Sequence, residues 1–160
     1  MILAQRLPIV AQFADLYDRA VAALQHYAAP IYDLAVRLWI AQVFFLSGRT
    51  KIADWDSTVY LFEDEYKVPI LPPEIAAYIG TTFELLMPVF LIVGLASRLA
   101  ALPLIGMACV IQLVLGGSNP DYDNVEHIYW LFLLVSIVIR GPGPLSADHF
   151  IRTRLTAGRG

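Results

Sequence analysis

Residues 75–116 read IAAYIGTTFELLMPVFLIVGLASRLAALPLIGMACVIQLVLG. Only Ala96-Ser97-Arg98 separates the two long apolar stretches in this segment. A helix of about 20 apolar residues is long enough to cross the hydrocarbon core of a bilayer. Because the connection between them is so short, the stretches predict two antiparallel transmembrane helices, 75–95 and 99–116, that pack as a hairpin.

Two further apolar stretches lie on either side of this hairpin. The first covers 29–47 with Pro30 in its opening turn, and the last covers 124–139 and ends before Arg140-Gly141-Pro142-Gly143-Pro144. The 160 residues are 58% hydrophobic and 16% charged, with a mean hydropathy of +0.63. Soluble domains average about 45–50% apolar and about 25% charged residues. We therefore expect an all-α integral membrane protein, an antiparallel four-helix transmembrane bundle over residues 29–140.

The segments outside the bundle are expected to lie at the membrane surface. In 1–28, apolar residues recur at helical spacing over about 9–27 and predict an amphipathic interfacial helix, or a helix packed on a partner subunit. In 141–160, Ser146 can cap a short basic interfacial helix with Asp148 in its first turn. In the connection 50–74, the sequence predicts a short helix capped by Asp56 or Ser57. A turn is predicted at 116–121, between the third and fourth spans.

The distribution of basic residues predicts the orientation. Arginines gather in the tail, the N-terminal segment and the 96–98 turn, whereas the other two connections are mainly acidic. Because basic residues favour the cytoplasmic side, both termini are expected in the cytoplasm. The net charge of −3 and the lack of a dense basic stretch argue against nucleic acid as a partner.

Several kinds of chemistry lack a sequence pattern. Cys109 stands alone in an apolar stretch and is expected to pack as a small apolar side chain. No haem attachment motif, phosphate-binding loop or dinucleotide motif is present, and no pairing of histidines or carboxylates predicts a metal site. We expect no catalytic residue and no intrinsic cofactor.

Charged residues within the spans are the first candidates for a site, because a charge at the bilayer centre costs at least about 2.5–3.5 kcal/mol. Arg37 lies near the middle of the first span, and Glu84 near the middle of the second. We predict that they meet as a buried ion pair. Asp33 lies one turn before Arg37 and would share its charge. This trio could set helix register alone, or it could bind substrate or handle protons.

A second polar set is expected in the outer half of the bundle. Gln42, Gln112 and His127 come from three different spans and occupy a similar predicted depth above Arg37 and Glu84. Their convergence would form a polar cavity for a ligand, with His127 as a hydrogen-bonding or proton-exchanging group or as a structural residue.

The order of these motifs resembles the DoxX family of small bacterial membrane proteins over about 36–150. The motifs are Arg37 in RLWIAQVFFLSGRTK, the connection YLFEDEYKVPILPP, Glu84 followed by LIVGLASR at 91–98, and GPGPLSAD at 141–148. The family is similar to the DoxD-type subunit of a thiosulfate:quinone oxidoreductase, and other members are encoded beside maturation proteins for copper-binding peptides. The resemblance implies the fold and an association with membrane redox systems.

Three functions are compatible with the sequence. The first is a redox-associated subunit that binds a quinone, or a similar amphipathic ligand or lipid, among Arg37, Gln42, Glu84, Gln112 and His127. The second is a structural or assembly subunit of a larger membrane complex, or a homo-oligomer, in which the ion pairs only hold the bundle. The third is a small proton-coupled transporter that uses Glu84 and His127.

Overall fold

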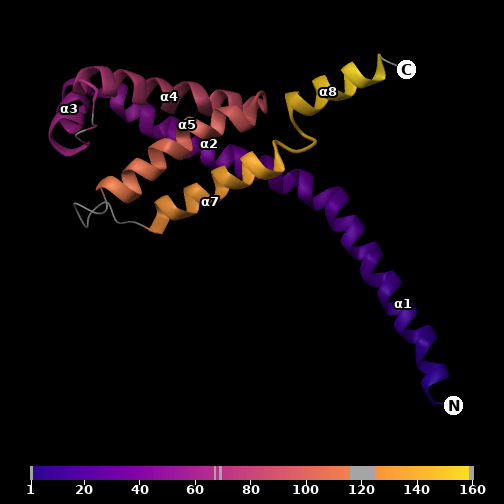
Figure 1. The fold of residues 1–160 in the computed structure, drawn as a ribbon. Coiled ribbons are helices and arrows are strands. Elements are labelled where there is room, and N and C mark those ends of the chain that lie inside the picture. Colours follow the sequence, from indigo (N-terminus) through magenta and orange to yellow (C-terminus); the bar gives the residue numbers. More distant parts are fainter. Residues whose placement is uncertain (1, 67, 69, 116–124, 159–160) are drawn as a thin grey trace.

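The computed structural model describes residues 2–66, 68, 70–115 and 125–158, and every regular element in these ranges is a helix (Figure 1). The long helices are α1 (Ile2–Ala23), α2 (Ala29–Ala53), α4 (Pro73–Val93), α5 (Ser97–Cys109) and α7 (Val125–Arg140). Two shorter helices are α3 (Trp55–Tyr60) and α8 (Ala147–Ala157). Three π-helical turns complete the set: η1 (Leu24–Ala28), η2 (Leu61–Tyr66) and η3 (Val110–Leu115). The all-α prediction is confirmed for the described residues.

Four helices pack as an antiparallel bundle. Helix α2 contacts α4 and α7, and α5 contacts the same two helices, so the four close around a common core. Figure 1 shows α3 at one end of this bundle, while α1 and α8 leave from the other end. Small and branched side chains fill the core, which allows close helix packing: Val36, Ile40, Ala41, Phe44, Leu91, Ala101, Leu104, Ala108, Leu134 and Ile137.

Many large apolar side chains are exposed on the outer surface of the bundle. Large apolar side chains point outward along all four helices, among them Trp39, Leu46, Val89, Ile92, Leu102, Phe132, Val135 and Ile139. Such an extensive exposed apolar surface is typical of helices that face lipid. The helices 10–53 and 73–93 are long and apolar enough to cross a membrane, and 97–113 forms a shorter apolar helix. Passage of all four helices through a bilayer stays a prediction.

The N-terminal helix continues into the bundle without a turn. Ala28 and Ala29 both keep a right-handed helical backbone, so α1, η1 and α2 form one continuous helix. Helix α2 also runs to Ala53, beyond the predicted end of the first span at Ser47. Helix α1 extends away from the bundle, with Phe13, Leu16 and other apolar side chains exposed (Figure 1). Its placement at a membrane interface remains a prediction.

The longer α2 also corrects the predicted cap of the next helix. Because α2 ends at Ala53, the first non-helical residue is Asp54, and Asp54 caps α3 in place of Asp56 or Ser57. Its carboxylate accepts hydrogen bonds from Ser57 N at 3.1 Å and Ser57 Oγ at 2.7 Å. These two bonds stabilise the ionised carboxylate and lower the pKa of Asp54.

The remaining predicted elements agree closely where the structure describes them. Ser146 caps α8, since its Oγ accepts from His149 N at 3.2 Å, and Asp148 stands in the first turn as predicted. The tight α4–α5 connection places Gly94 and Ala96 in the left-handed region, with φ of 74° and 47°. Helix α5 therefore starts at Ser97, slightly before the predicted span. The predicted turn at 116–121 lies outside the described residues.

Candidate functional site

A buried ion pair joins α2 to α4. Lys51 Nζ lies 2.8 Å from each carboxylate oxygen of Glu84. Ser47, one turn before Lys51, accepts a hydrogen bond from Lys51 Nζ at 2.9 Å, and its hydroxyl donates to Glu84 at 3.3 Å. A buried carboxylate needs such compensation, because desolvation of an isolated charge costs several kcal/mol.

The two helices meet closely because Gly48 has no side chain. A Cβ atom at Gly48 would lie 2.9 Å from Leu85 Cγ and 3.0 Å from Glu84 Cβ. The backbone of α2 thus occupies the space that a larger residue would need. This close approach brings Glu84 within reach of the Lys51 side chain, whose long apolar stem lies along the bundle.

The Lys51–Glu84 pair forms part of the wall of a cavity of about 270 Å³. The cavity lies along the groove between α4 and α5–η3, and η2 contributes Phe62 and Tyr66 to it. Lys51, Tyr66 and Glu84 are its polar side chains. The other residues that line the cavity are apolar: Phe62, Val68, Leu71, Ala76, Ile79, Gly80, Phe83, Pro103, Gly106, Met107, Val110 and Ile111.

Two glycines shape this cavity. At Gly80, a Cβ atom would lie 3.0 Å from the Phe62 ring, so the missing side chain makes room for Phe62. At Gly106, a Cβ atom would meet no heavy atom within 4 Å and would project into open space. Since Gly106 lines the cavity, the absence of a side chain at this position of α5 leaves part of the cavity open.

Tyr66 places a phenol at the cavity wall. Its ring packs edge-on against Phe62, with ring centroids 4.9 Å apart. Burial raises the pKa of Tyr66 to about 12, and the negative charges of Glu84 and Glu65 add to this shift. The phenol stays protonated at neutral pH and keeps its O–H group as a hydrogen-bond donor.

Arg37 does not meet Glu84, so the predicted ion pair is wrong. Arg37 is fully buried near the other end of α2, where Nη1 donates to the carbonyl oxygens of Leu91 at 2.9 Å and Ile92 at 3.3 Å. Nη2 donates to the carbonyl of Leu145. In this antiparallel pair Arg37 lies beside Leu91, about 10 Å of helix rise from Glu84 at 1.5 Å per residue.

Arg37 thus acts as a clamp at the end of α4. A cation beside the last carbonyls of a helix is favoured by the helix dipole. The same guanidinium holds the 141–146 segment, since it also binds Leu145. Gly94 leaves the necessary space, because a Cβ atom there would lie 2.6 Å from Arg37 Nη1.

Asp33 pairs with a different arginine from the one predicted. Its carboxylate lies 3.1 Å from Arg140 Nη2 and accepts from Arg140 Nε at 3.2 Å. This bond joins the start of α2 to the end of α7. Arg37, by contrast, donates its hydrogen bonds to backbone carbonyls. The prediction that Asp33 and Glu84 share Arg37 is therefore wrong.

The other predicted ligand-binding residues do not converge on the cavity. Gln42 is exposed on α2, one position after the buried Ala41. Gln112 is half-buried in η3, and His127 is half-buried in α7, where its ring packs edge-on against Trp130 with centroids 4.8 Å apart. None of these three side chains lines the cavity that Lys51 and Glu84 share. Their role in ligand binding stays a prediction.

Lys51 and Tyr66 are the candidate site residues that sequence reasoning missed. The predicted end of the first span at Ser47 leaves Lys51 outside the span, but α2 continues to Ala53. It follows Arg37 by 14 residues, which is close to four helical turns and places both residues on the same face. That spacing was the available signal for Lys51. Nothing in the sequence singles out Tyr66 as a candidate site residue.

Within residues 2–66, 68, 70–115 and 125–158, no group of three or more His, Cys, Asp and Glu side chains is arranged to hold a metal ion. Cys109 is a half-buried free thiol on α5.

These observations define a class: a protein whose described residues form a helical bundle with an apolar exterior, a buried ion pair and an amphipathic cavity. The DoxX family model matches residues 32–117, more than half of the chain, and the chain belongs to this family. Family membership and the two long apolar helices together indicate a membrane protein.

One curated relative is a Bacillus subtilis (strain 168) protein named "Putative oxidoreductase CatD". It is 29% identical over 126 residues, which cover 76% of this chain and 87% of the relative. No solved structure matches the chain.

Proposed function

We propose that this DoxX protein is a redox-associated membrane subunit that binds a quinone, or a similar amphipathic carbonyl compound, in the cavity between α4 and α5. The observation that carries the proposal is the composition of the cavity wall. An apolar surface with an ammonium group, a phenol and a carboxylate suits a ligand that has an apolar body and a few polar atoms. The name of the curated relative, an oxidoreductase, supports the redox association.

The polar groups suit the two ends of a quinone ring. Lys51 Nζ donates hydrogen bonds to Ser47 Oγ and Glu84 Oε1, which leaves its third N–H for a ligand. Tyr66 brings a phenol to the same cavity wall, and a quinone offers two carbonyl acceptors. Glu84 holds the Lys51 ammonium in place through its two short contacts. In this proposal the chain binds and orients the ligand, and a partner protein supplies the electrons.

The cavity also has a route to lipid. Ile79 of α4 and Val110 of η3 line it and are themselves partly exposed on the outer surface of the bundle. A ligand head group in the cavity could therefore leave its apolar tail between the two helices and in the bilayer. A volume of about 270 Å³ is at the small end of ligand pockets and fits a ring-sized head group better than a whole lipid.

The membrane arrangement is part of the same proposal. Helices α2, α4, α5–η3 and α7 would cross the bacterial inner membrane, with both termini in the cytoplasm. The Arg37 end of the bundle would then face inward, and the Lys51–Glu84 pair would lie in the outer half.

A role as an assembly subunit is the second candidate, and α1 favours it. Its exposed apolar side chains, among them Val10, Phe13, Leu16, Tyr17 and Leu24, are not covered by the bundle. A partner subunit or a second copy could bind this surface. Purification in a mild detergent would distinguish the two candidates, because a monodisperse monomer that retains quinone would support only the first.

The direct test is a binding titration with a short-chain quinone, followed by fluorescence quenching, on three proteins. Wild type should bind, Y66F should bind about tenfold more weakly after the loss of one hydrogen-bond donor, and Y129F should match wild type. Tyr129 is an exposed tyrosine on α7 and is the matched control. Equal affinity of Y66F and wild type would exclude Tyr66 from the site, and saturation by no protein would refute the proposal.

A further inference from the structure

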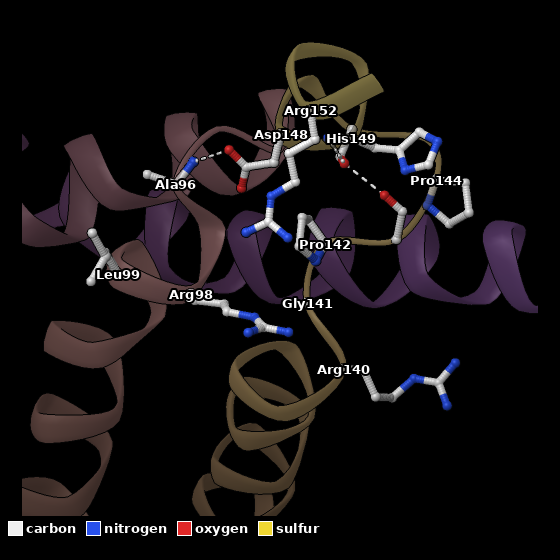
Figure 2. Close-up of a pocket in the computed structure, with 12 residues that line it drawn as sticks. Ala96, Arg98, Leu99, Arg140, Gly141, Pro142, Pro144, Asp148, His149 and Arg152 are labelled. Atoms are coloured by element: carbon white, nitrogen blue, oxygen red, sulfur yellow. Dashed lines mark hydrogen bonds between the residues drawn. The ribbon is translucent and has the colours of Figure 1, made fainter. Parts of the chain in front are cut away.

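A second cavity, of about 510 Å³, lies at the opposite end of the bundle, where α5 begins and α7 ends (Figure 2). The 141–146 segment and the first turns of α8 form its remaining walls. It is unrelated to the Lys51–Glu84 cavity, because the two share no lining residue. Its charged lining residues are Arg98, Arg140, Asp148 and Arg152, and His149 lines it as well.

The negative charge in this cavity is already engaged by the backbone. One oxygen of Asp148 accepts from Ala96 N at 2.9 Å, and the other accepts from Ser97 N at 3.3 Å. Asp148 thereby caps the start of α5 and attaches α8 to the α4–α5 turn. Among the positive groups, Arg140 is bound to Asp33.

Two guanidinium groups are left to face the cavity. Arg98 reaches it from the first turn of α5 and Arg152 from α8, and both line the cavity drawn in Figure 2. Neither forms an ion pair with a carboxylate in the described part of the chain. Arg98 donates to the carbonyl of Ile139 at 3.3 Å, which leaves most of its N–H donors available.

We propose that this cavity binds the phosphate of an anionic phospholipid head group. Arginine pairs hold phosphate through charge-assisted, often bidentate, hydrogen bonds. Basic pockets between helices at a membrane surface have the geometry to take up lipid head groups. The site lies at the end of helices with an apolar exterior, where lipid phosphates are expected to lie.

The rim of the cavity favours a lipid over a soluble phosphate compound. Leu99 lines the cavity and is 68% exposed, and Ile139, just before Arg140, is 72% exposed. Leu145, on the segment that follows, is also exposed. These side chains provide apolar surface for acyl chains directly beside the two guanidinium groups.

The test is native mass spectrometry of the full chain in mild detergent, titrated with phosphatidylglycerol, phosphatidylcholine or soluble glycerol phosphate. Phosphatidylglycerol should bind at least about tenfold more tightly than phosphatidylcholine, and R152Q should lose about tenfold of that affinity. Arg152 has no side-chain partner in the described residues, so this change removes nothing that holds the fold. R98Q should weaken binding similarly, and R98K should restore part of it.

The matched control is R154Q. Arg154 lies on the same helix but stacks on Phe150, 4.8 Å from the ring centroid, and does not line the cavity. R154Q should bind phosphatidylglycerol with the same affinity as wild type. An equal loss in R154Q and R152Q would show that only surface charge matters and would overturn the site. Glycerol phosphate binding as tightly as phosphatidylglycerol would overturn the assignment to lipid. Neither result depends on quinone binding.

Discussion

Lys51 and Glu84 form an almost completely buried ion pair, with side chains 12% and 4% exposed and Nζ 2.8 Å from Oε2. The pair joins α2 to α4 beside the cavity to which we assign the ligand. Desolvation makes such a pair a weak source of net stability, but loss of one partner leaves an uncompensated charge. Because the pair lies at the cavity wall, Glu84 also fixes the position of the Lys51 ammonium, which can donate a hydrogen bond to a ligand.

Replacing one member of the pair should be more harmful than replacing both. K51M should destabilise the protein by about 3–5 kcal/mol, because Glu84 would remain buried without its counter-ion. The double variant K51M/E84L should lose less than the sum of K51M and E84L, because it leaves no unpaired charge. Thermal unfolding of the purified variants in detergent measures this difference.

The control for this cycle is the Asp15–Arg19 pair on α1, which is largely exposed, with side chains 61% and 77% accessible. D15N should change stability by less than about 1 kcal/mol, as is typical of surface pairs. If K51M were no more damaging than D15N, the pair would not be buried as described.

Arg37 should be needed for the attachment of α8. In R37K, one ammonium cannot reproduce the planar set of donors that binds Leu91, Ile92 and Leu145 together. We expect faster hydrogen exchange at Gly94–Ser97 and at 145–149, where Asp148 N donates to Gly94 O. R49K, at an exposed position of the same helix, is the control and should exchange like wild type. Unchanged exchange in R37K would contradict the clamp.

Alanine should have opposite effects at two glycines. In G48A, the new Cβ would be only 2.9 Å from Leu85 Cγ, and the separation of α2 from α4 should cost about 1–3 kcal/mol. In G106A, the new Cβ would meet open space, and the better helix propensity should add up to about 1 kcal/mol. Thermal unfolding of the two variants side by side should give melting temperatures on opposite sides of wild type; equal shifts would contradict the described packing.

Tyr66 should ionise later than an ordinary tyrosine. Its pKa of about 12 in the folded protein exceeds the ordinary tyrosine pKa of 10.0, so the folded state resists loss of the phenolic proton. The associated stability is fully present below pH 10 and is lost as the pH rises from 10 to 12. Y66F should be less sensitive to pH in this window, and the wild-type minus Y66F absorbance difference should show titration near pH 12. A midpoint at pH 10 would show that Tyr66 is exposed.

The sequence predicted the helices better than their register. Apolar stretches placed the main helices within a few residues, and Ser146 with Asp148 predicted the cap of α8. The predicted first span ends at Ser47, whereas α2 continues through the charged residues Arg49 and Lys51 to Ala53. Charged residues often mark the end of a membrane span, but Lys51 remains within the helix because Glu84 compensates its charge.

The predicted end of the first span at Ser47 led to the wrong pairing of Arg37 with Glu84. With a span of 29–47, Arg37 falls at mid-helix opposite Glu84, whereas the full α2 places Arg37 beside Leu91 and Gly48 beside Glu84. The exposure of Gln42 could have been expected from helical phase, because the buried positions Arg37, Ala41, Phe44 and Gly48 form one stripe that omits it. Depth alone, without phase, does not predict which side chains share a cavity.

The most direct test of the central claim is to identify the quinone carried by the purified protein and by a variant with a filled cavity. G106L should project into the open space at Gly106 and occupy the ligand volume without displacing a neighbouring group at its Cβ. Organic extraction and mass spectrometry of protein purified in mild detergent should find near-stoichiometric quinone in wild type and a loss of at least about tenfold in G106L. Equal quinone in both proteins, or none in wild type, would contradict the assignment of this cavity.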